Sequence, residues 1–531
     1  MFRATRPRGE DVPPPPQPGD MHATSLESLL ALSLCAVVLL ASVAFLRRSS
    51  ELSRALAELQ DESLRPWPTH MKPVPSGTSQ PRPELVILIS LDTLRADHLD
   101  LYGYARETAP NLRALGEQGA FFRTVAAQSA QTLISHKSIL TGKYPATLML
   151  EQTGADLLEL SALHAAREYL VDTFQRVEGT LAAGFRERGF RTAGFTDGAW
   201  MSRAAGFAHG FETFDDAGGG LEASLPRALA WLEVSTREPA FLFLHADDVH
   251  CPYASPEPFD GAFCPDHSAH VPLAERCGQG ALHGEALAPA ELAALVDHYD
   301  GGVLAADHQL GRFFDALRAR GLYERALIVV TSDHGESLGE RGLVGHGGLY
   351  PEQLFVPLIL KLPASWNQAP IQVSEPAEMI DLLPTLFALC GVPAQSDLDG
   401  RSLLPVLFRG VRGRDFLVAQ TVFEDGPGLR SSPAKRTVLR AGRWQVINDV
   451  ERSEASFFAL ERDPRALVAY PIGAAEFAPL LDLLLERGRA AARVALRRAA
   501  PVAFSAELER ELDQLGYGTA RAGLGADHDL R

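Results

Sequence analysis

Three short segments of the chain carry residue types that can bind a metal ion or attack an ester. Asp92 follows one strongly apolar run, and Asp333 and His334 follow another. Carboxylates together with an imidazole form a mixed oxygen and nitrogen ligand set for a divalent cation. Thr132 opens the third segment, and its hydroxyl could act as a nucleophile near neutral pH if a metal ion lowered its pKa.

Each segment taken alone also has a structural interpretation. An aspartate at the end of a strand often caps the helix that follows. A threonine such as Thr132 is more often a helix cap than a nucleophile, and Asp333-His334-Gly335 could form a turn. The functional interpretation therefore depends on the three segments being considered together.

The elements that must position these residues are indicated by short apolar runs. The runs that we interpret as buried parallel strands are Leu85 to Leu91, Phe241 to Leu244 and Ala326 to Thr331. Helical stretches such as Tyr169 to Arg188 and Glu291 to Arg320 lie between them. This alternation predicts a doubly wound α/β sheet with helices on both faces. Ligands of such sheets bind beyond the carboxyl ends of the strands, where Asp92 and Asp333 fall.

The pattern changes after about residue 412. Four short runs there predict a small antiparallel sheet: Phe416 to Thr421, Arg436 to Leu439, Trp444 to Ile447 and Phe457 to Leu460. Residues 474–498 are rich in Ala, Leu and Arg and are predicted to form a helix. We expect a disordered tail (1–24), a transmembrane anchor (25–47), a juxtamembrane linker (48–83), a catalytic core (84–412), a C-terminal subdomain with its helix (413–500) and a second tail (501–531).

The anchor is predicted from the apolar stretch Leu26 to Leu46. About 21 residues at ~1.5 Å each span the ~30 Å of a bilayer's hydrocarbon core. A buried soluble helix is the alternative. The length of the run and the lack of a small-x-small site after it argue against a cleaved signal peptide. Leu34 before Cys35 argues against a lipoprotein signal.

The orientation of this single-pass anchor is indicated by two conflicting arguments. Arg47 and Arg48 flank its C-terminal end, which would keep the large domain inside the cell by the positive-inside rule. Large exported domains of the family named below usually lie outside. We expect an extracytoplasmic catalytic domain.

Composition excludes one class of partner. The chain of 531 residues has a net charge of −17, which argues against general nucleic-acid binding. Its 46% hydrophobic content is ample for a large core. Cys251, Cys264 and Cys277 fall in one loop-like region without zinc-site spacing, so they are either unpaired thiols or, in an exported domain, disulfide-bonded.

Taken in order, the three segments resemble the sulfatase family of the alkaline phosphatase superfamily. The motifs that carry the resemblance are Ser90-Leu91-Asp92-Thr93, Leu140-Thr141-Gly142-x-Tyr144-Pro145, Ser332-Asp333-His334-Gly335-Glu336, Tyr299-Asp300-Gly301, Gly345-His346-Gly347 and Asp381-Leu382-Leu383-Pro384-Thr385. It covers roughly residues 84 to 465. It implies an alkaline-phosphatase-like fold and one divalent metal ion, either Ca, Mg or Mn, with Zn as an alternative. The implied ligands are Asp92, Asp333, His334 and the oxygen of Thr132.

The chain departs from the family at the nucleophile. Typical sulfatases read Cys/Ser-x-Pro-Ser/Ala-Arg where this chain reads Thr132-Leu133-Ile134-Ser135-His136. Threonine cannot be converted to formylglycine, the nucleophile of sulfatases. The second of two adjacent acidic ligands is also replaced, by Thr93. These changes resemble the phosphotransferase branch, which includes phosphoethanolamine transferases and lipoteichoic acid synthases, although those relatives have several membrane spans.

Other residues are assigned by the same resemblance. His250 is expected to contact the substrate oxyanion or protonate the leaving group, with a structural loop histidine as the alternative. His346 stands where sulfatases often use lysine and could bind the oxyanion. His136 matches the family arginine and is expected to orient the nucleophile. Lys137 either binds substrate or is simply solvated.

The resulting hypothesis is a metal-dependent hydrolase or transferase that acts on a phosphate or sulfate ester through Thr132. Its partner would be an anionic ester, such as a glycan or lipid head group. A true sulfatase using unmodified threonine is one alternative. It is disfavoured because a sulfated threonine lacks the hemiacetal route by which formylglycine expels sulfate. A catalytically inactive, membrane-tethered binding protein is the alternative from another class.

Overall fold

The computed structural model describes residues 82–148, 179–234, 238–263, 287–393, 397–414, 417–423, 431–441, 444–449, 454–460 and short stretches up to residue 469. All of them belong to one compact unit, residues 67–531. No helix within these ranges is long and apolar enough to cross a membrane. The predicted anchor Leu26 to Leu46, both predicted tails and the predicted helix 474–498 lie outside the described residues.

A mixed sheet forms the centre of this unit. In spatial order its eight described strands are β11 (Ile371–Val373), β2 (Ala120–Phe122), β10 (Leu358–Lys361), β7 (Ala326–Thr331), β1 (Leu85–Leu91), β6 (Ala240–Ala246), β4 (Arg191–Phe195) and β5 (Thr213–Asp215). The strands from β7 to β5 are parallel, as predicted. β10 is antiparallel to both of its neighbours, so the sheet is not purely parallel.

β1 occupies the middle because its sequence is apolar on both faces. All seven of its residues are buried, which is typical of a strand covered by helices on two sides. Val86 and Leu88 face one core cluster, and Leu85, Ile87 and Ile89 face the other. Successive side chains of a strand point to opposite faces, so one continuous apolar run supplies both cores.

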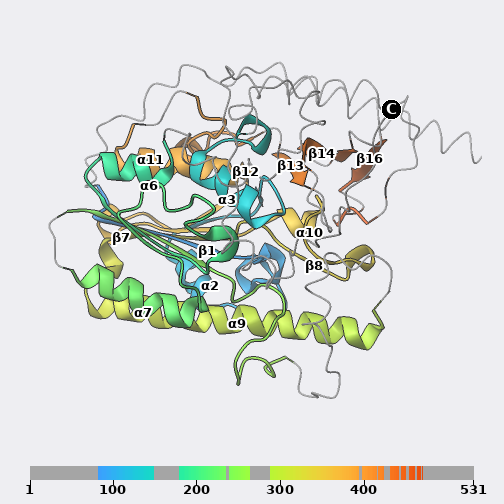
Figure 1. Cartoon of the computed structure of the whole chain (residues 1–531), viewed down its shortest axis with the longest axis horizontal. Coiled ribbons are helices and arrows are strands. Elements are labelled where there is room, and N and C mark those ends of the chain that lie inside the picture. Colours follow the sequence, from blue (N-terminus) through green and yellow to red (C-terminus); the bar gives the residue numbers. More distant parts are fainter. Residues whose placement is uncertain are drawn as a thin grey trace, which may run out of the picture. The chain divides into compact units, whose positions relative to one another are not determined.

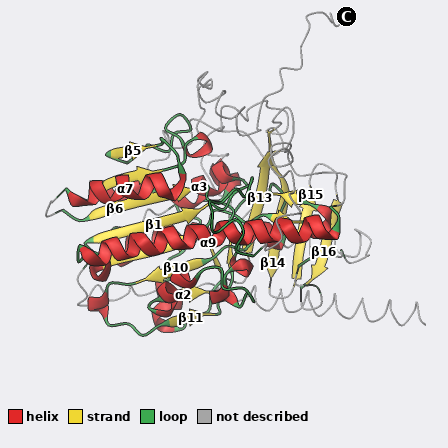
Figure 2. Ribbon diagram, turned by 90° about the horizontal axis from the view of Figure 1, so that it is seen from below, coloured by secondary structure: helices red, strands yellow, loops and turns green. Residues whose placement is uncertain are grey.

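Helices cover the two faces of the sheet (Figure 1). One face packs against α2 (Pro110–Glu117), α7 (Gly220–Glu233) and α9 (Pro289–Ala319). The other packs against α3 (Thr132–Thr141), α6 (Leu181–Glu187), α11 (Leu382–Cys390) and α12 (Leu404–Arg409). In Figure 2 the long helix α9 runs roughly along the strands of the central sheet and extends beyond their ends. The doubly wound arrangement predicted from the sequence is therefore confirmed.

The observed ranges of some helices and strands match the predicted ranges more closely than others do. β7 and β1 match their predicted ranges, and α9 begins two residues before the predicted Glu291. The helix predicted from Tyr169 begins, in its described part, only at Leu181. Thr180 caps it, since its Oγ1 accepts a hydrogen bond of 3.2 Å from the Ala183 backbone N–H.

The C-terminal region forms the predicted antiparallel sheet. Its strands are β13 (Leu417–Phe423), β14 (Ser431–Ala441), β15 (Trp444–Asp449) and β16 (Glu454–Ala459). β13 attaches this sheet to the α/β core through backbone groups. The Gln420 N–H donates to the Gln128 carbonyl at 2.8 Å, and the Val418 N–H donates to the Glu378 carboxylate at 2.5 Å.

Short elements join these layers. Two-residue strands pair as β3 (Val125–Ala126) with β12 (Ala377–Glu378) and as β8 (Ser337–Leu338) with β9 (Val344–Gly345). A single helical turn, α10 (Pro351–Leu354), precedes β10. The β8–β9 hairpin follows the segment after β7 in the chain.

Candidate active site

The first cluster of candidate residues lies where β1 and β7 end. These strands are hydrogen-bonded neighbours, with Ser90 opposite Thr331. Asp92 and Asp333 leave the sheet just beyond this pair, and the Asp92 N–H still bonds to the Ala246 carbonyl of β6 at 2.9 Å. Asp92, Asp333 and His334 are 2%, 0% and 0% exposed. The sheet thus brings Asp92 close to Asp333 and His334, which lie about 240 positions further along the sequence.

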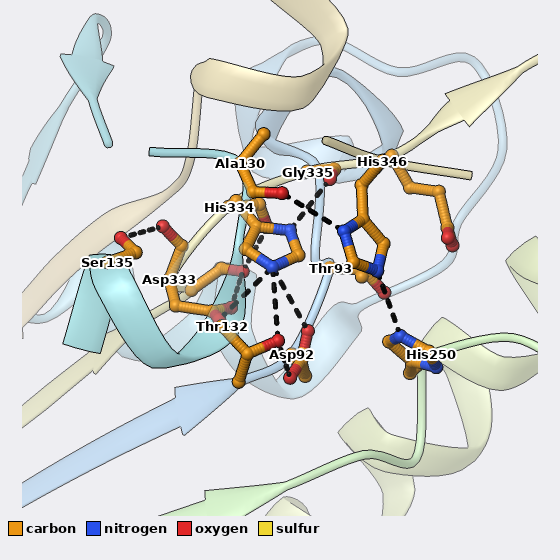
Figure 3. A network of polar contacts seen from close by, with 12 residues as sticks. Asp92, Thr93, Ala130, Thr132, Ser135, His250, Asp333, His334, Gly335 and His346 are labelled. Carbon is orange, nitrogen blue, oxygen red and sulfur yellow. Dashed lines mark hydrogen bonds and ion pairs between the residues drawn. The ribbon is translucent and has the colours of Figure 1, made fainter. Parts of the chain in front are cut away.

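Thr132 joins this cluster from the opposite side, at the first residue of α3. Its hydroxyl donates to Asp92 Oδ2 at 3.1 Å and lies 3.3 Å from His334 Nε2 (Figure 3). The Ser135 hydroxyl donates to the Asp333 carbonyl at 2.6 Å, which ties the first turn of α3 to the loop after β7. The predicted helix onset at Thr132 is confirmed, and backbone N–H groups of this turn can face an anion.

The oxygen and nitrogen atoms of the cluster suit a cation. Potential ligand atoms of Asp92, Asp333 and His334 lie within 4.8 Å of one another. Asp92 Oδ1 and Asp333 Oδ2 are buried without a hydrogen-bond partner. The Nδ1 of His334 lies 3.0 Å from the Gly335 carbonyl and therefore carries the hydrogen, which leaves the Nε2 lone pair directed at the two carboxylates. Buried carboxylates without partners are costly unless a charge of opposite sign compensates them.

The electrostatics of the two aspartates differ. Burial opposes ionisation of Asp92, but a hydrogen bond from His245 and the charges of neighbouring histidines hold its pKa well below the usual value. Burial and the nearby Asp92 charge raise the pKa of Asp333 to about 6. Two carboxylates this close repel each other, and a divalent cation between them would let both stay ionised.

Thr93, which replaces the family's second acidic ligand, has a strained backbone. Its φ of 59° lies in the left-handed region that β-branched residues avoid. The Tyr299 hydroxyl, which donates to the Thr93 carbonyl at 2.8 Å, helps to hold this conformation. The Thr93 hydroxyl is buried and has no hydrogen-bond partner.

His250 and His346 meet beside this cluster. Their Nε2 atoms are 3.2 Å apart, and the ring of His346 lies 4.5 Å from that of His334 between centroids. Burial opposes protonation of His250, but the charges of Asp92 and Glu336 raise its pKa to about 9. Burial and two neighbouring histidines hold the pKa of His346 well below its usual value. The structure thus brings these two predicted residues together at the edge of the site.

His136 and Lys137 lie deeper than the substrate-facing residues. His136 is fully buried; its Nε2 accepts from the Ser90 hydroxyl at 2.9 Å and its Nδ1 donates to the Thr132 carbonyl at 2.9 Å. It contacts the backbone of Thr132 and not the hydroxyl. Lys137 is also fully buried, so the interpretation as a solvated lysine is wrong. Its substrate-binding role remains a prediction.

Two titratable residues of the site, His245 and Glu336, were not assigned a role from the sequence. His245, at the end of β6, lies 3.4 Å from Asp92 Oδ2 and 3.6 Å from Asp247 Oδ1. Glu336 lies within 4.8 Å of the ligand atoms of His250 and His346. The signal for His245 was present, because it directly follows a predicted strand as Asp92 does. Glu336 was part of a quoted motif, but only the fold assigns it neighbours.

The state of one of the three loop cysteines follows from the structure of the loop after β6. Cys251 is disulfide-bonded, so of the two alternatives the unpaired thiol is wrong for this residue. Cys264 and Cys277 lie outside the described residues.

Comparisons with known proteins show what the chain is similar to. The sulfatase family model matches residues 84–392. The multifunctional alkaline phosphatase superfamily protein PehA of Trinickia caryophylli is 30% identical over 35% of this chain and 40% of its own. The N-acetylglucosamine-6-O-sulfatase of Bacteroides thetaiotaomicron is 34% identical over 41% of this chain and 40% of its own. The chain thus spans well under two thirds of these relatives' lengths.

A solved structure supports the fold. The phosphonate monoester hydrolase of Agrobacterium radiobacter superposes with a TM-score of 0.61 at 21% identity, covering 76% of this chain and 95% of its own. The alkaline-phosphatase-like α/β architecture predicted from the sequence is therefore confirmed.

Proposed function

This chain belongs to the sulfatase family, and we propose that it is a metal-dependent hydrolase or transferase of phosphate or sulfate esters in which Thr132 is the nucleophile. The observation that carries the proposal is the position of the Thr132 hydroxyl, 3.1 Å from Asp92 and 3.3 Å from His334 at the start of α3. A capping threonine would precede the helix, whereas Gln131 holds the capping position of α3 and Thr132 is the first residue of the helix.

Asp92, Asp333 and His334 would hold the cation, with the Thr132 oxygen completing the ligand set. When bound, a divalent ion supplies positive charge that lowers the pKa of a coordinated hydroxyl and polarises an ester oxygen. The mixed donors are compatible with Ca²⁺, Mg²⁺ or Mn²⁺, and the histidine also admits Zn²⁺.

We assign the remaining steps of the reaction to side chains and backbone groups of the chain. The Thr132 oxygen attacks the phosphorus or sulfur atom, and N–H groups in the first turn of α3 bind the oxygens around it. We assign protonation of the leaving oxygen to His250 and binding of the substrate oxyanion to His346. His136 acts as a positioning residue, because its bond to the Thr132 carbonyl fixes the first turn of α3.

Phosphate esters are the favoured class. A phosphothreonine can be cleared by attack at phosphorus, by water in a hydrolase or by an acceptor alcohol in a transferase. The relative named N-acetylglucosamine-6-O-sulfatase supports a sugar ester as one candidate substrate. The test is a panel of aryl sulfate, phosphate monoester, phosphodiester and phosphonate substrates, each with several divalent metals. Turnover that survives in Thr132→Ala would contradict the proposal.

The rival from another class is an inactive binding protein. The carboxylates of Asp92 and Asp333 argue against it, because each keeps one buried oxygen without a hydrogen bond, and a binding surface does not require two such buried carboxylates side by side. Metal analysis of the purified protein discriminates, since only the enzyme hypothesis requires bound metal.

We also propose that Leu26 to Leu46 anchors the chain in a membrane with the catalytic domain outside. The support is the length of this apolar run. Detergent-dependent extraction of the full-length protein and protease access in intact cells test the two parts of this proposal separately.

A further inference from the structure

The segment between β3 and α3 leads directly to Thr132 and has no regular structure of its own. Residues 127–131 form neither helix nor strand, and α3 has no side-chain cap. Gln128, Ser129 and Ala130 are nevertheless fully buried. Buried backbone groups outside helices and sheets need hydrogen-bond partners from elsewhere in the molecule. The position of Thr132 therefore depends on the elements that supply those partners.

Gln128 connects this segment to the C-terminal sheet. Its backbone carbonyl accepts the Gln420 N–H of β13 at 2.8 Å, and its Nε2 donates to the Val418 carbonyl of the same strand at 3.4 Å. The same Nε2 donates to the Ala126 carbonyl at 3.1 Å, and Oε1 accepts the Ile380 N–H at 3.0 Å. One buried glutamine thus joins β3, the turn after β12, and β13.

β13 also contacts the segment that follows α3. The side chain of Gln420 accepts the Ala146 N–H on its Oε1 at 3.0 Å. The Val418 N–H donates to one carboxylate oxygen of Glu378, and the Tyr144 hydroxyl donates to the other at 2.7 Å. A single strand of the C-terminal sheet therefore holds the chain on both sides of the helix that begins with Thr132.

Apolar contacts support the same connection. Ala419 of β13 belongs to a small buried cluster with Ala130, Leu349 and Leu354. All four side chains are at most 2% exposed. Because buried side chains are closely packed, a shift of β13 would also shift the segment before Thr132.

We propose that Gln128 is a positioning residue for Thr132, and that the C-terminal sheet, through β13, keeps α3 in the position that the reaction requires. The effect on rate rests on the proposed function, whereas the connection between β13 and α3 does not. The side chain of Gln128 bonds to backbone groups of other elements, so it acts on Thr132 through the chain. A misplacement of about 1 Å can lower a rate about a hundred-fold.

The test compares two buried glutamines in the full-length protein. Gln128→Met keeps an unbranched side chain of similar length and removes its hydrogen bonds. Gln445→Met is the matched control, because Gln445 is buried on β15 of the same sheet and its Nε2 has no hydrogen-bond partner. If Gln128→Met does not fold, Gln420→Met removes the bond to Ala146 from a half-buried position and tests the other end of α3.

The first measurement is hydrogen exchange, which does not depend on activity. Gln128→Met should speed the exchange of amides in residues 126–138 about tenfold, and Gln445→Met should leave it unchanged. Gln420→Met should speed exchange in residues 142–148. Exchange equal to that of the parent in the segment concerned would overturn the connection between β13 and α3.

The second measurement is steady-state hydrolysis of para-nitrophenyl phosphate or para-nitrophenyl sulfate, whichever the parent hydrolyses faster. Gln128→Met should lower kcat about ten- to a hundred-fold and leave KM and the bound metal nearly unchanged. A lower melting temperature with the kcat of the parent, as expected for Gln445→Met, would overturn the positioning role. Full turnover by Thr132→Ala would reject the proposed function, and the exchange result would still decide whether Gln128 holds α3.

Discussion

The two groups of polar side chains in the candidate site are built in different ways. Asp92, Asp333 and His334 lie within three residues of the ends of neighbouring strands of the central sheet and are at most 2% exposed. His250 lies four residues beyond the end of β6, and His346 follows the two-residue strand β9; both are only partly buried. Sheet hydrogen bonds thus fix the first group, whereas turns and side-chain hydrogen bonds fix the second.

This difference suggests that the two groups have different roles in the proposed reaction. A buried group on rigid strands can keep two carboxylates close together and so hold a cation in place. A half-buried group on loops can contact a substrate and exchange protons or ions with solvent. Changes in the first group should therefore affect metal and activity together, and changes in the second should affect activity while the metal at Asp92 stays.

The largest effect is expected for Thr132→Ala. Removal of a metal-activated nucleophile should lower kcat/KM about a thousand-fold or more, since each ~1.4 kcal/mol of barrier is tenfold in rate. Metal at Asp92 should remain, because three ligands are left. Thr132→Ser should retain part of the activity. The matched control is Ser129→Ala, which removes a nearby buried hydroxyl that has no hydrogen-bond partner; steady-state kinetics and metal content check all three variants.

Asp333→Asn and His250→Gln compare the two groups directly. Asp333→Asn should lose the metal at Asp92 and the activity together while the fold persists. His250→Gln should lower kcat by about a hundred-fold, in the range typical of general acid catalysis, and should keep that metal. Metal analysis and circular dichroism of both variants provide the measurement. Full metal occupancy in Asp333→Asn would show that the strand-end group is not the ligand set.

A smaller effect is expected for His136→Gln, which tests positioning. His136 bonds to the Ser90 hydroxyl and the Thr132 carbonyl but does not reach the reacting hydroxyl. Loss of one or two buried hydrogen bonds, each worth about 1 kcal/mol, should lower kcat about tenfold and leave KM nearly unchanged. If His136 had only a structural role, His136→Gln would lower the melting temperature without lowering kcat at an unchanged KM.

The smallest effect concerns the pair of Arg95 and Asp97 on the loop after β1, 2.8 Å apart. Burial opposes ionisation of Asp97, but the Arg95 guanidinium lowers its pKa from 3.8 to about 2. A lowered carboxylate pKa contributes stability that is present above pH 3.8 and lost as the pH falls toward 2. The Asp97 side chain is 55% exposed, so screening keeps the effect small.

Thermal melts of the parent and of Asp97→Asn at pH 7 and below pH 4 check this expectation. The difference in melting temperature should be small at pH 7 and should shrink in acid. A difference that grows as the pH falls would show that the pair does not stabilise the loop.

The sequence predicted the strand-end group better than the loop group for a physical reason. Short apolar runs such as β1 and β7 favour buried strands, and the residues after parallel strands meet at one edge of the sheet. β10 itself was not predicted, because Leu358–Lys361 is only four residues long and ends in a charged residue. Likewise, no local pattern links His250 to His346 or Glu336, since turns determine where those side chains meet.

The central claim is that the Thr132 oxygen forms a covalent bond to the substrate's phosphorus or sulfur atom. The most direct measurement is to incubate the metal-loaded protein with substrate, quench it in acid, digest it and analyse the peptide that contains Thr132 by mass spectrometry. The account predicts a phosphate or sulfate group on Thr132 in the parent, and none on the corresponding peptide of Thr132→Ala. A modification on another residue, or full turnover by Thr132→Ala, would contradict it.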